Sequence, residues 1–114
     1  MTDHRLQRLC RIAQLQRDCD MAQLNKLAQA RTETQAKCDQ LSRPQPLVSD
    51  PALFAVRQAH LAWTNAQRLC LNQALAQQTA QMLNQKSRTA KSFGRADALE
   101  KLVARLDQRR THSP

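Results

Sequence analysis

The chain has 114 residues and a formal net charge of +9, with a single glycine, four prolines and no tyrosine. This composition lacks the turn and strand residues of a β fold, and two phenylalanines with one tryptophan are too few to fill a globular core. The sequence therefore predicts an all-α protein, and its charge predicts an acidic partner.

The N-terminus opens onto an amphipathic segment, and no stretch approaches the roughly twenty apolar residues that a membrane span requires. We therefore expect a soluble, cytoplasmic chain with no signal peptide and no membrane insertion. Four cysteines lie far apart, without a Cys-x-x-Cys pair and without a histidine near enough in sequence to complete a metal site. This spacing favours small buried hydrophobic side chains over a metal site. The four are Cys10, Cys19, Cys38 and Cys70.

The first predicted helix spans residues 3–41, and Thr2 or Asp3 is suited to cap it. Two stripes run along this helix. The early stripe consists of Leu6, Leu9, Ile12 and Cys19, and the later stripe, in steps of three and four residues, consists of Leu24, Leu27, Arg31, Thr34, Cys38 and Leu41. Because the two stripes do not join in one unbroken heptad, the sequence predicts a register shift near residues 17–21.

Residues 42–50 form the predicted break between helices. Pro44, Pro46 and Pro51 end the first helix and hold the connection extended, and Asp50 followed by Pro51 is typical of a helix start. A short connection between two long helices normally makes them antiparallel neighbours. The predicted fold is therefore an antiparallel two-helix coiled-coil hairpin.

The second predicted helix spans residues 51–108 and is the longer of the two. Its predicted contact seam is built mostly from small or polar side chains in heptad steps: Ala59, Ala62, Ala66, Leu69, Gln73, Ala76, Ala80, Leu83, Ser87 and Ala90. Four larger side chains are expected to run beside this seam: Phe54, Leu61, Leu75 and Met82.

Because the second helix is longer, its C-terminal end is expected to project past the N-terminus as an uncovered binding surface. The apolar stripe of that end comprises Leu99, Leu102, Val103 and Leu106. Gly94 is either a tolerated glycine or the mark of a bend or a close helix contact. Residues 109–114 are expected to be a frayed basic tail.

Positive charge is distributed unevenly along the chain. Residues 1–42 hold seven bases and five acids, whereas residues 51–96 hold six bases and no acid. An antiparallel hairpin would gather the bases of both chain ends into one basic tip. These bases are Arg5, Arg8, Arg11, Lys91, Arg95, Lys101, Arg105, Arg109 and Arg110. Each base could also be an ordinary solvated residue, or a helix-end cation that offsets the macrodipole.

No catalytic constellation occurs in the sequence. It has no glycine-rich phosphate loop and no His-Glu-x-x-His pair, and His4, His60 and His112 are scattered. We therefore expect a protein that is not an enzyme and that uses no cofactor or metal. A nucleic-acid partner is less favoured, because the chain lacks aromatic side chains set for base stacking and recognisable RNA- or DNA-binding signatures.

The segment Phe93-Gly94-Arg95-Ala96-Asp97-Ala98-Leu99-Glu100-Lys101-Leu102, in a basic two-helix hairpin with a proline-containing loop, resembles the flagellar FliJ and type III secretion YscO family of export-apparatus stalk proteins. The resemblance implies a shaft whose terminal end enters a hexameric export ATPase ring and whose loop end points towards the export gate. The implied ring contacts are Arg8, Arg11, Arg95, Lys101, Leu102 and Arg105. The implied loop contacts are Pro44, Pro46 and Leu47.

The sequence thus favours a non-enzymatic coiled-coil stalk or adaptor of a flagellar or type III export apparatus. A basic coiled-coil adaptor or a nucleic-acid-associated helical protein is the alternative. Pairing of two copies into a four-helix homodimer is a further alternative that the alanine-rich seam leaves open.

Overall fold

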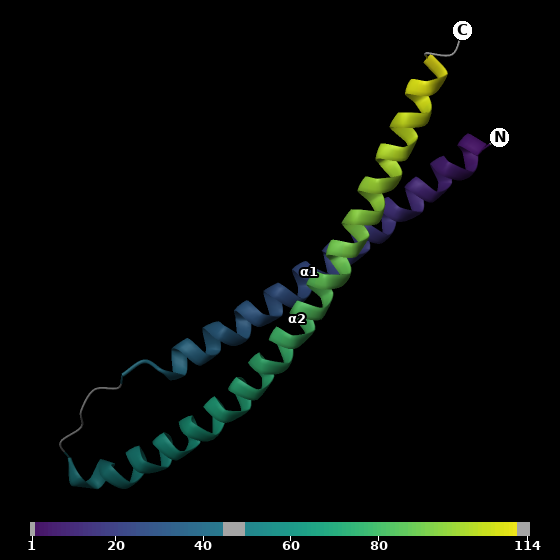
Figure 1. Cartoon of the computed structure of the whole chain (residues 1–114). Coiled ribbons are helices and arrows are strands. Elements are labelled where there is room, and N and C mark those ends of the chain that lie inside the picture. The colour runs from purple at the N-terminus through teal and green to yellow at the C-terminus, as the bar shows by residue number, and fades with distance from the viewer. Residues whose placement is uncertain (1, 45–49, 112–114) are drawn as a thin grey trace. The chain divides into compact units, whose positions relative to one another are not determined.

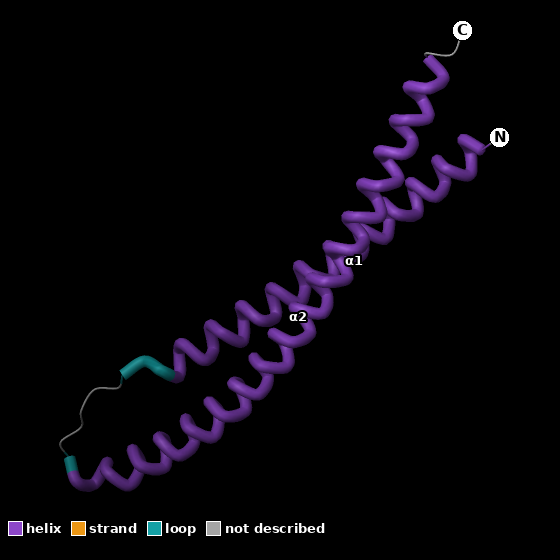
Figure 2. The backbone as a smooth tube through the Cα atoms, viewed as in Figure 1, coloured by secondary structure: helices purple, strands orange, loops and turns teal. Residues whose placement is uncertain are grey.

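The fold consists of two long helices in the residues that the structure, a computed structural model, describes: 2–44 and 50–111. Helix α1 spans Thr2–Leu41, and helix α2 spans Phe54–Thr111 after a short 3-10 turn, η1, at Pro51–Leu53 (Figure 1). No strand occurs in these residues, which Figure 2 shows as helix and loop alone. The all-α prediction is confirmed.

Both helix ends at the connection follow local sequence signals. The amide of Ser42 donates to the carbonyls of Cys38 at 3.1 Å and Asp39 at 3.2 Å, which closes the last turn of α1. The side chain of Asp50 accepts a hydrogen bond from the amide of Ala52 at 3.0 Å, and Pro51 supplies the fixed backbone angle of the first position. The predicted break and restart are therefore confirmed.

The bounds of the second helix differ from the prediction in two ways. Its first three residues form the 3-10 turn, and α2 continues to Thr111. Arg109 and Arg110, which were assigned to a frayed tail, lie in the last helical turn, where cations offset the helix dipole.

The chain divides into two compact units. Unit 1 contains Met1–Lys26 and Met82–Pro114, and unit 2 contains Leu27–Gln81. In unit 1 the side-chain amide of Gln14 donates to Glu100 at 3.0 Å. The amide of Gln85 donates to the backbone oxygen of Asp20 at 3.1 Å. Residues later in α1 thus contact residues earlier in α2, so the two helices pair antiparallel.

Unit 2 has the same antiparallel pairing. The guanidinium of Arg31 donates to the hydroxyl of Thr79 at 2.9 Å, and the thiol of Cys38 lies 4.0 Å from the side-chain oxygen of Asn72. In unit 2, too, residues later in α1 contact residues earlier in α2. The predicted antiparallel hairpin with a longer second helix is confirmed.

The contact stripe of α1 runs without interruption in steps of three and four residues. Its members are half-buried or buried: Leu6, Cys10, Ala13, Arg17, Asp20, Leu24, Leu27, Arg31, Thr34, Cys38 and Leu41. The predicted later stripe is therefore confirmed. The predicted register shift at residues 17–21 is wrong, because Arg17 and Asp20 occupy the contact positions there.

The predicted early stripe of α1 is wrong except for Leu6. Leu9 and Ile12 are 52% and 53% exposed, and Cys19 is also exposed. The physical reason is that small and polar residues take the contact positions of unit 1. A prediction based on the positions of the large aliphatic side chains therefore identifies the neighbouring flank of the helix and not its contact face.

The predicted seam of α2 is also wrong, because all ten of its positions are exposed. The contact face in unit 1 comprises Met82, Gln85, Thr89, Ser92, Ala96, Leu99, Val103 and Leu106. In unit 2 it comprises Thr64, Gln67, Leu71, Ala74, Leu75, Gln78 and Thr79. Of the four side chains expected beside the seam, Leu75 and Met82 lie on the contact face, whereas Phe54 and Leu61 are exposed. Alanine on an exposed helix face favours the helix through its backbone propensity, without packing.

The buried residues between the helices are small or polar, and the large aliphatic residues of the contact faces are half-buried. Ala13 and Ala96 are the buried hydrophobic residues of the described chain, at 6% and 0% exposure, and no large side chain there is fully buried. Thr34, Gln85, Thr89 and Ser92 are the buried polar residues. No large apolar side chain of the described residues is thus locked into a closed core, and hydrogen bonds help to fix the register of the helices.

Asp20 is the centre of the largest polar cluster. The amide of Gln85 donates to its carboxylate at 3.3 Å, and the hydroxyl of Ser92 donates to its other carboxylate oxygen. The hydroxyl of Thr89 lies 3.2 Å from its backbone carbonyl. A polar layer inside a coiled coil specifies register, because any shift leaves its members without partners.

The C-terminal end of α2 does not project beyond α1. His4, Leu6 and Gln7 line a cavity of about 220 Å³ together with residues of the last α2 turns, among them Val103 and Leu106. Leu99, like these two, is half-buried. The predicted uncovered stripe is therefore wrong except for Leu102, which is 45% exposed.

The extra length of α2 lies instead at the connection end of unit 2. Cys38 lies opposite Asn72 and α1 ends three residues later, so the first turns of α2 extend past the end of α1. Apolar side chains in those turns are exposed: Leu53, Phe54, Val56, Leu61 and Trp63.

Replacing Asp20 with alanine should lower the free energy of unfolding by about 1–3 kcal/mol, because the buried hydroxyl of Ser92 loses its acceptor and the amide of Gln85 keeps only the backbone oxygen of residue 20. Thermal unfolding followed by circular dichroism measures the change. Asp18→Ala is the matched control, since Asp18 lies on the same helix with its side chain 70% exposed. An equal loss in both variants would contradict the register role of Asp20.

Trp63 should emit at the long wavelength of a hydrated indole and be quenched readily by acrylamide, because it is 54% exposed. As the single tryptophan, it reports the start of α2 without mutation. Shielded, short-wavelength emission from the isolated chain would show that these first turns are covered.

Candidate functional site

The residues predicted to contact the ATPase ring all belong to unit 1, and all are exposed: Arg8, Arg11, Arg95, Lys101, Leu102 and Arg105. The two chain ends thus contribute to one unit, since the cavity between them is lined by His4 from α1 and Arg110 from α2. Of the predicted loop contacts, Pro44 is exposed, whereas Pro46 and Leu47 lie outside the described residues.

One side of unit 1 carries paired charges, and we call it the paired side: Gln14, Arg17, Asp18, Phe93 and Glu100. Arg17 lies 3.6 Å from the carboxylate of Asp18 and 3.9 Å from that of Glu100. Its guanidinium carbon also lies 5.6 Å from the centre of the Phe93 ring. Positive charge on this side is therefore balanced by nearby carboxylates.

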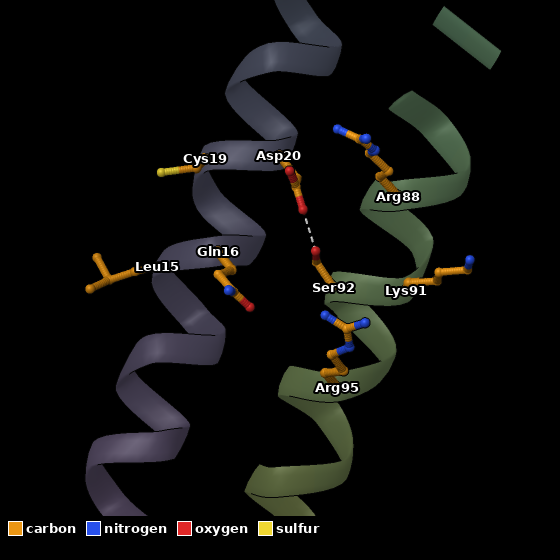
Figure 3. A pocket seen from close by; sticks show the side chains of 8 residues that line it. All are labelled: Leu15, Gln16, Cys19, Asp20, Arg88, Lys91, Ser92 and Arg95. Carbon is orange, nitrogen blue, oxygen red and sulfur yellow. Dashed lines mark hydrogen bonds between the residues drawn. The ribbon is translucent and has the colours of Figure 1, made fainter. Parts of the chain in front are cut away.

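On another side a groove runs between the helices, and we call it the basic groove. It measures about 550 Å³ and is lined by Leu15, Gln16, Cys19 and Asp20 of α1 and by Arg88, Lys91, Ser92 and Arg95 of α2 (Figure 3). In Figure 3 the dashed line joins Asp20 to Ser92, and Gln16 points towards α2. Leu15 and Cys19 belong to the lining on α1, and in Figure 3 their side chains point away from α2.

The basic groove carries a net positive charge. Arg88, Lys91 and Arg95 are exposed and form no ion pair with any residue of the described chain. Asp20 is the single carboxylate of the lining, and it already accepts hydrogen bonds from Gln85 and Ser92. Three cations without carboxylate partners give the groove an attraction for anionic groups.

The cations of the groove begin a longer stripe on α2. Exposed residues follow one another in steps of three and four: Arg88, Lys91, Arg95, Ala98, Leu102, Arg105 and Arg109. This spacing places them on one helix face. Leu102 and Arg105 of the predicted site therefore continue the line of the groove. Lys101 lies off that line and forms an ion pair with Asp97 at 3.0 Å.

Sequence reasoning missed Arg88 and the apolar rim of the groove. The signal for Arg88 was present, because it lies in the acid-free run from residue 51 to residue 96 and in step with Lys91 and Arg95. Leu15 carried no such signal, since its exposure depends on which face of α1 meets α2.

The cysteines are all free thiols with different environments. Cys10 and Cys38 are half-buried on the contact stripe, but Cys19 and Cys70 are exposed, so the prediction of buried side chains is wrong for these two. Across residues 2–44 and 50–111, no three His, Cys, Asp or Glu side chains come together as a metal site would require.

Neither α1 nor α2, as far as the structure describes them, has an apolar stretch sufficient to traverse a lipid bilayer. Comparison of the chain with protein-family models, with curated proteins and with solved structures found no match.

Gly94 lies on the exposed face of α2 beside the groove residue Arg95. A Cβ atom added at Gly94 would meet nothing within 4 Å, so a close helix contact does not explain this glycine. Its backbone is helical, which any residue can adopt. Of the interpretations offered, the tolerated glycine fits the space around it.

Gly94→Ala should raise the free energy of unfolding by about 0.5–1 kcal/mol, because alanine loses less conformational entropy in a helix. The reverse change at a nearby exposed position, Ala90→Gly, should lower it by a similar amount. Chemical denaturation of both variants measures the pair. Destabilisation by Gly94→Ala would show that this position needs glycine for another reason.

Proposed function

We propose that this protein is a non-enzymatic coiled-coil adaptor that binds an acidic protein surface through unit 1. The observation that carries the proposal is the line of exposed cations on α2, beginning with Arg88, Lys91 and Arg95, which form no ion pair with a carboxylate in residues 2–44 or 50–111. Arg8 of α1 adds to the charge of the same unit.

The thin interior supports a role in binding. The described chain buries no large side chain completely, so the hairpin gains little hydrophobic stabilisation alone. Two paired helices also offer few concave surfaces in which a small substrate could be enclosed and separated from water. Most of the side chains are therefore available to a macromolecular partner.

We further propose that the partner is the hexameric ATPase of a flagellar or type III export apparatus, with the chain as its cytoplasmic stalk and with the connection end directed to the export gate. The support is the resemblance of residues 93–102 to the stalk family and the exposure of Arg8, Arg11, Lys101 and Arg105. Attraction between a basic shaft and an acidic collar raises the association rate more than the affinity. Such an interaction suits an element that must turn or release.

Lys101→Glu with Arg105→Glu should weaken capture of an export ATPase by at least about tenfold, because two exposed cations on the partner-facing unit become anions. The double variant should keep the helical content of the native chain, since both side chains are exposed. A pull-down with purified ATPase after nuclease treatment, quantified against salt, provides the measurement.

Lys37→Glu with Arg68→Glu is the matched control, because it changes the net charge equally at exposed positions of unit 2. It should retain most of the binding. Equal binding by both double variants would refute the assignment of unit 1. Salt-dependent capture of duplex nucleic acid with no protein partner would favour the nucleic-acid alternative.

A further inference from the structure

We propose that the basic groove of unit 1 is a docking site for one amphipathic α-helix of another protein, with carboxylates along one edge and aliphatic side chains along the other. The acidic edge would lie on Arg88, Lys91 and Arg95, and the aliphatic edge on Leu15 and its neighbours. This inference rests on the proposal that unit 1 binds an acidic protein surface, and it does not depend on the export role.

The apolar wall of this site lies on α1 beside the contact stripe. Leu9, Ile12 and Leu15 are 52%, 53% and 64% exposed, and they follow one another in steps of three along one flank of the helix. Of these three, Leu15 lines the groove, as does Cys19, whereas Leu9 and Ile12 lie outside the lining, nearer the N-terminus of the same helix. Large aliphatic side chains grouped on one exposed flank mark an interaction surface more often than isolated ones do.

The basic wall has the spacing of a helix partner. Arg88, Lys91 and Arg95 span seven residues, or about 10 Å of helix. Carboxylates placed at positions three, four or seven residues apart on a facing helix repeat over the same distance. A helix lying along the groove can therefore pair several of its acids with these cations at once.

The two sides of unit 1 explain why such a helix would choose the groove. On the paired side, Asp18 and Glu100 already neutralise Arg17 and would repel an acidic edge. In the groove, the one carboxylate belongs to Asp20 and is occupied by Gln85 and Ser92. Repulsion on one side and attraction on the other together determine the docking side.

The exposed aliphatic side chains of unit 1 also favour binding of a third helix, because that helix would bury them. A two-helix pair buries Ala13 and Ala96 but leaves Leu9, Ile12 and Leu15 exposed. A helix in the groove would cover these aliphatic side chains and add the apolar contact that the hairpin lacks. A second copy of this chain is a poor occupant, because it would bring the cations of two grooves together.

The test uses a fluorescent synthetic helix of about three heptads, with leucine at its a and d positions and glutamate along one edge. A matched peptide carries lysine in place of each glutamate. Fluorescence anisotropy against the full chain should show roughly micromolar binding of the glutamate peptide and at least tenfold weaker binding of the lysine peptide.

Arg88→Glu with Lys91→Glu should weaken binding of the glutamate peptide by at least about tenfold and should strengthen binding of the lysine peptide. Lys37→Glu with Lys86→Glu changes the net charge equally at exposed positions outside the groove lining and should alter either affinity by less than about twofold. Neither pair includes Lys101 or Arg105, so failure of this proposal is distinguishable from failure of the ATPase assignment.

Cys19 supplies a local probe, because it is an exposed thiol in the groove lining. In a variant with Cys10, Cys38 and Cys70 replaced by alanine, the glutamate peptide should slow iodoacetamide labelling of Cys19 several-fold. A variant that keeps only Cys70, which is exposed in unit 2, should label at an unchanged rate.

Three results would overturn the proposal. The first is that the native chain binds the glutamate and lysine peptides with equal affinity, or that the groove and control variants bind the glutamate peptide with equal affinity. The second is binding without protection of Cys19. The third is that the glutamate peptide does not protect Cys19 from labelling, whereas duplex nucleic acid does, or whereas self-association of the chain, detected by sedimentation, does.

Discussion

The hydrogen-bonded layer around Asp20 is the constraint on which unit 1 depends. Asp20 meets Gln85, Thr89 and Ser92 of α2, and the described chain has no fully buried large side chain that could take over this role. A slip along either helix would leave these groups buried without partners, at a cost larger than the small apolar contacts could offset. Register here is therefore set by polar geometry.

That register decides which side chains remain outside. With Arg17 and Asp20 on the contact stripe, Leu9, Ile12 and Leu15 are turned to one flank, and Arg88 and Lys91 border the groove beside it. The acidic partners of Arg17 gather on the other side. The same polar layer that aligns the helices thus separates a charge-balanced side from a basic, partly apolar one.

The amino-acid composition explains both the absence of fully buried large side chains in the described residues and the exposure of many apolar side chains. A chain rich in alanine and glutamine forms stable helices at low cost in side-chain entropy, yet it provides few large side chains for a core. Half of the leucine, isoleucine and valine residues in the described chain are exposed outside the contact stripes, including Leu9 and Ile12 in unit 1 and Leu53 and Val56 in unit 2. Binding of a partner would bury surface that folding leaves exposed.

The amino-acid sequence alone determined the two helices, their proline-rich connection, the Asp50 cap, the antiparallel pairing and the contact stripe of α1 from Leu24 to Leu41. These features follow from local propensity, capping and loop length, which act over a few residues. Only the tertiary structure decided the α2 contact face, the first half of the α1 stripe and the end at which α2 extends past α1. At the centre of unit 1 the contact positions hold aspartate, serine, threonine and alanine, and hydrogen bonds between the polar ones select the register. The periodicity of the hydrophobic residues therefore indicated the wrong face.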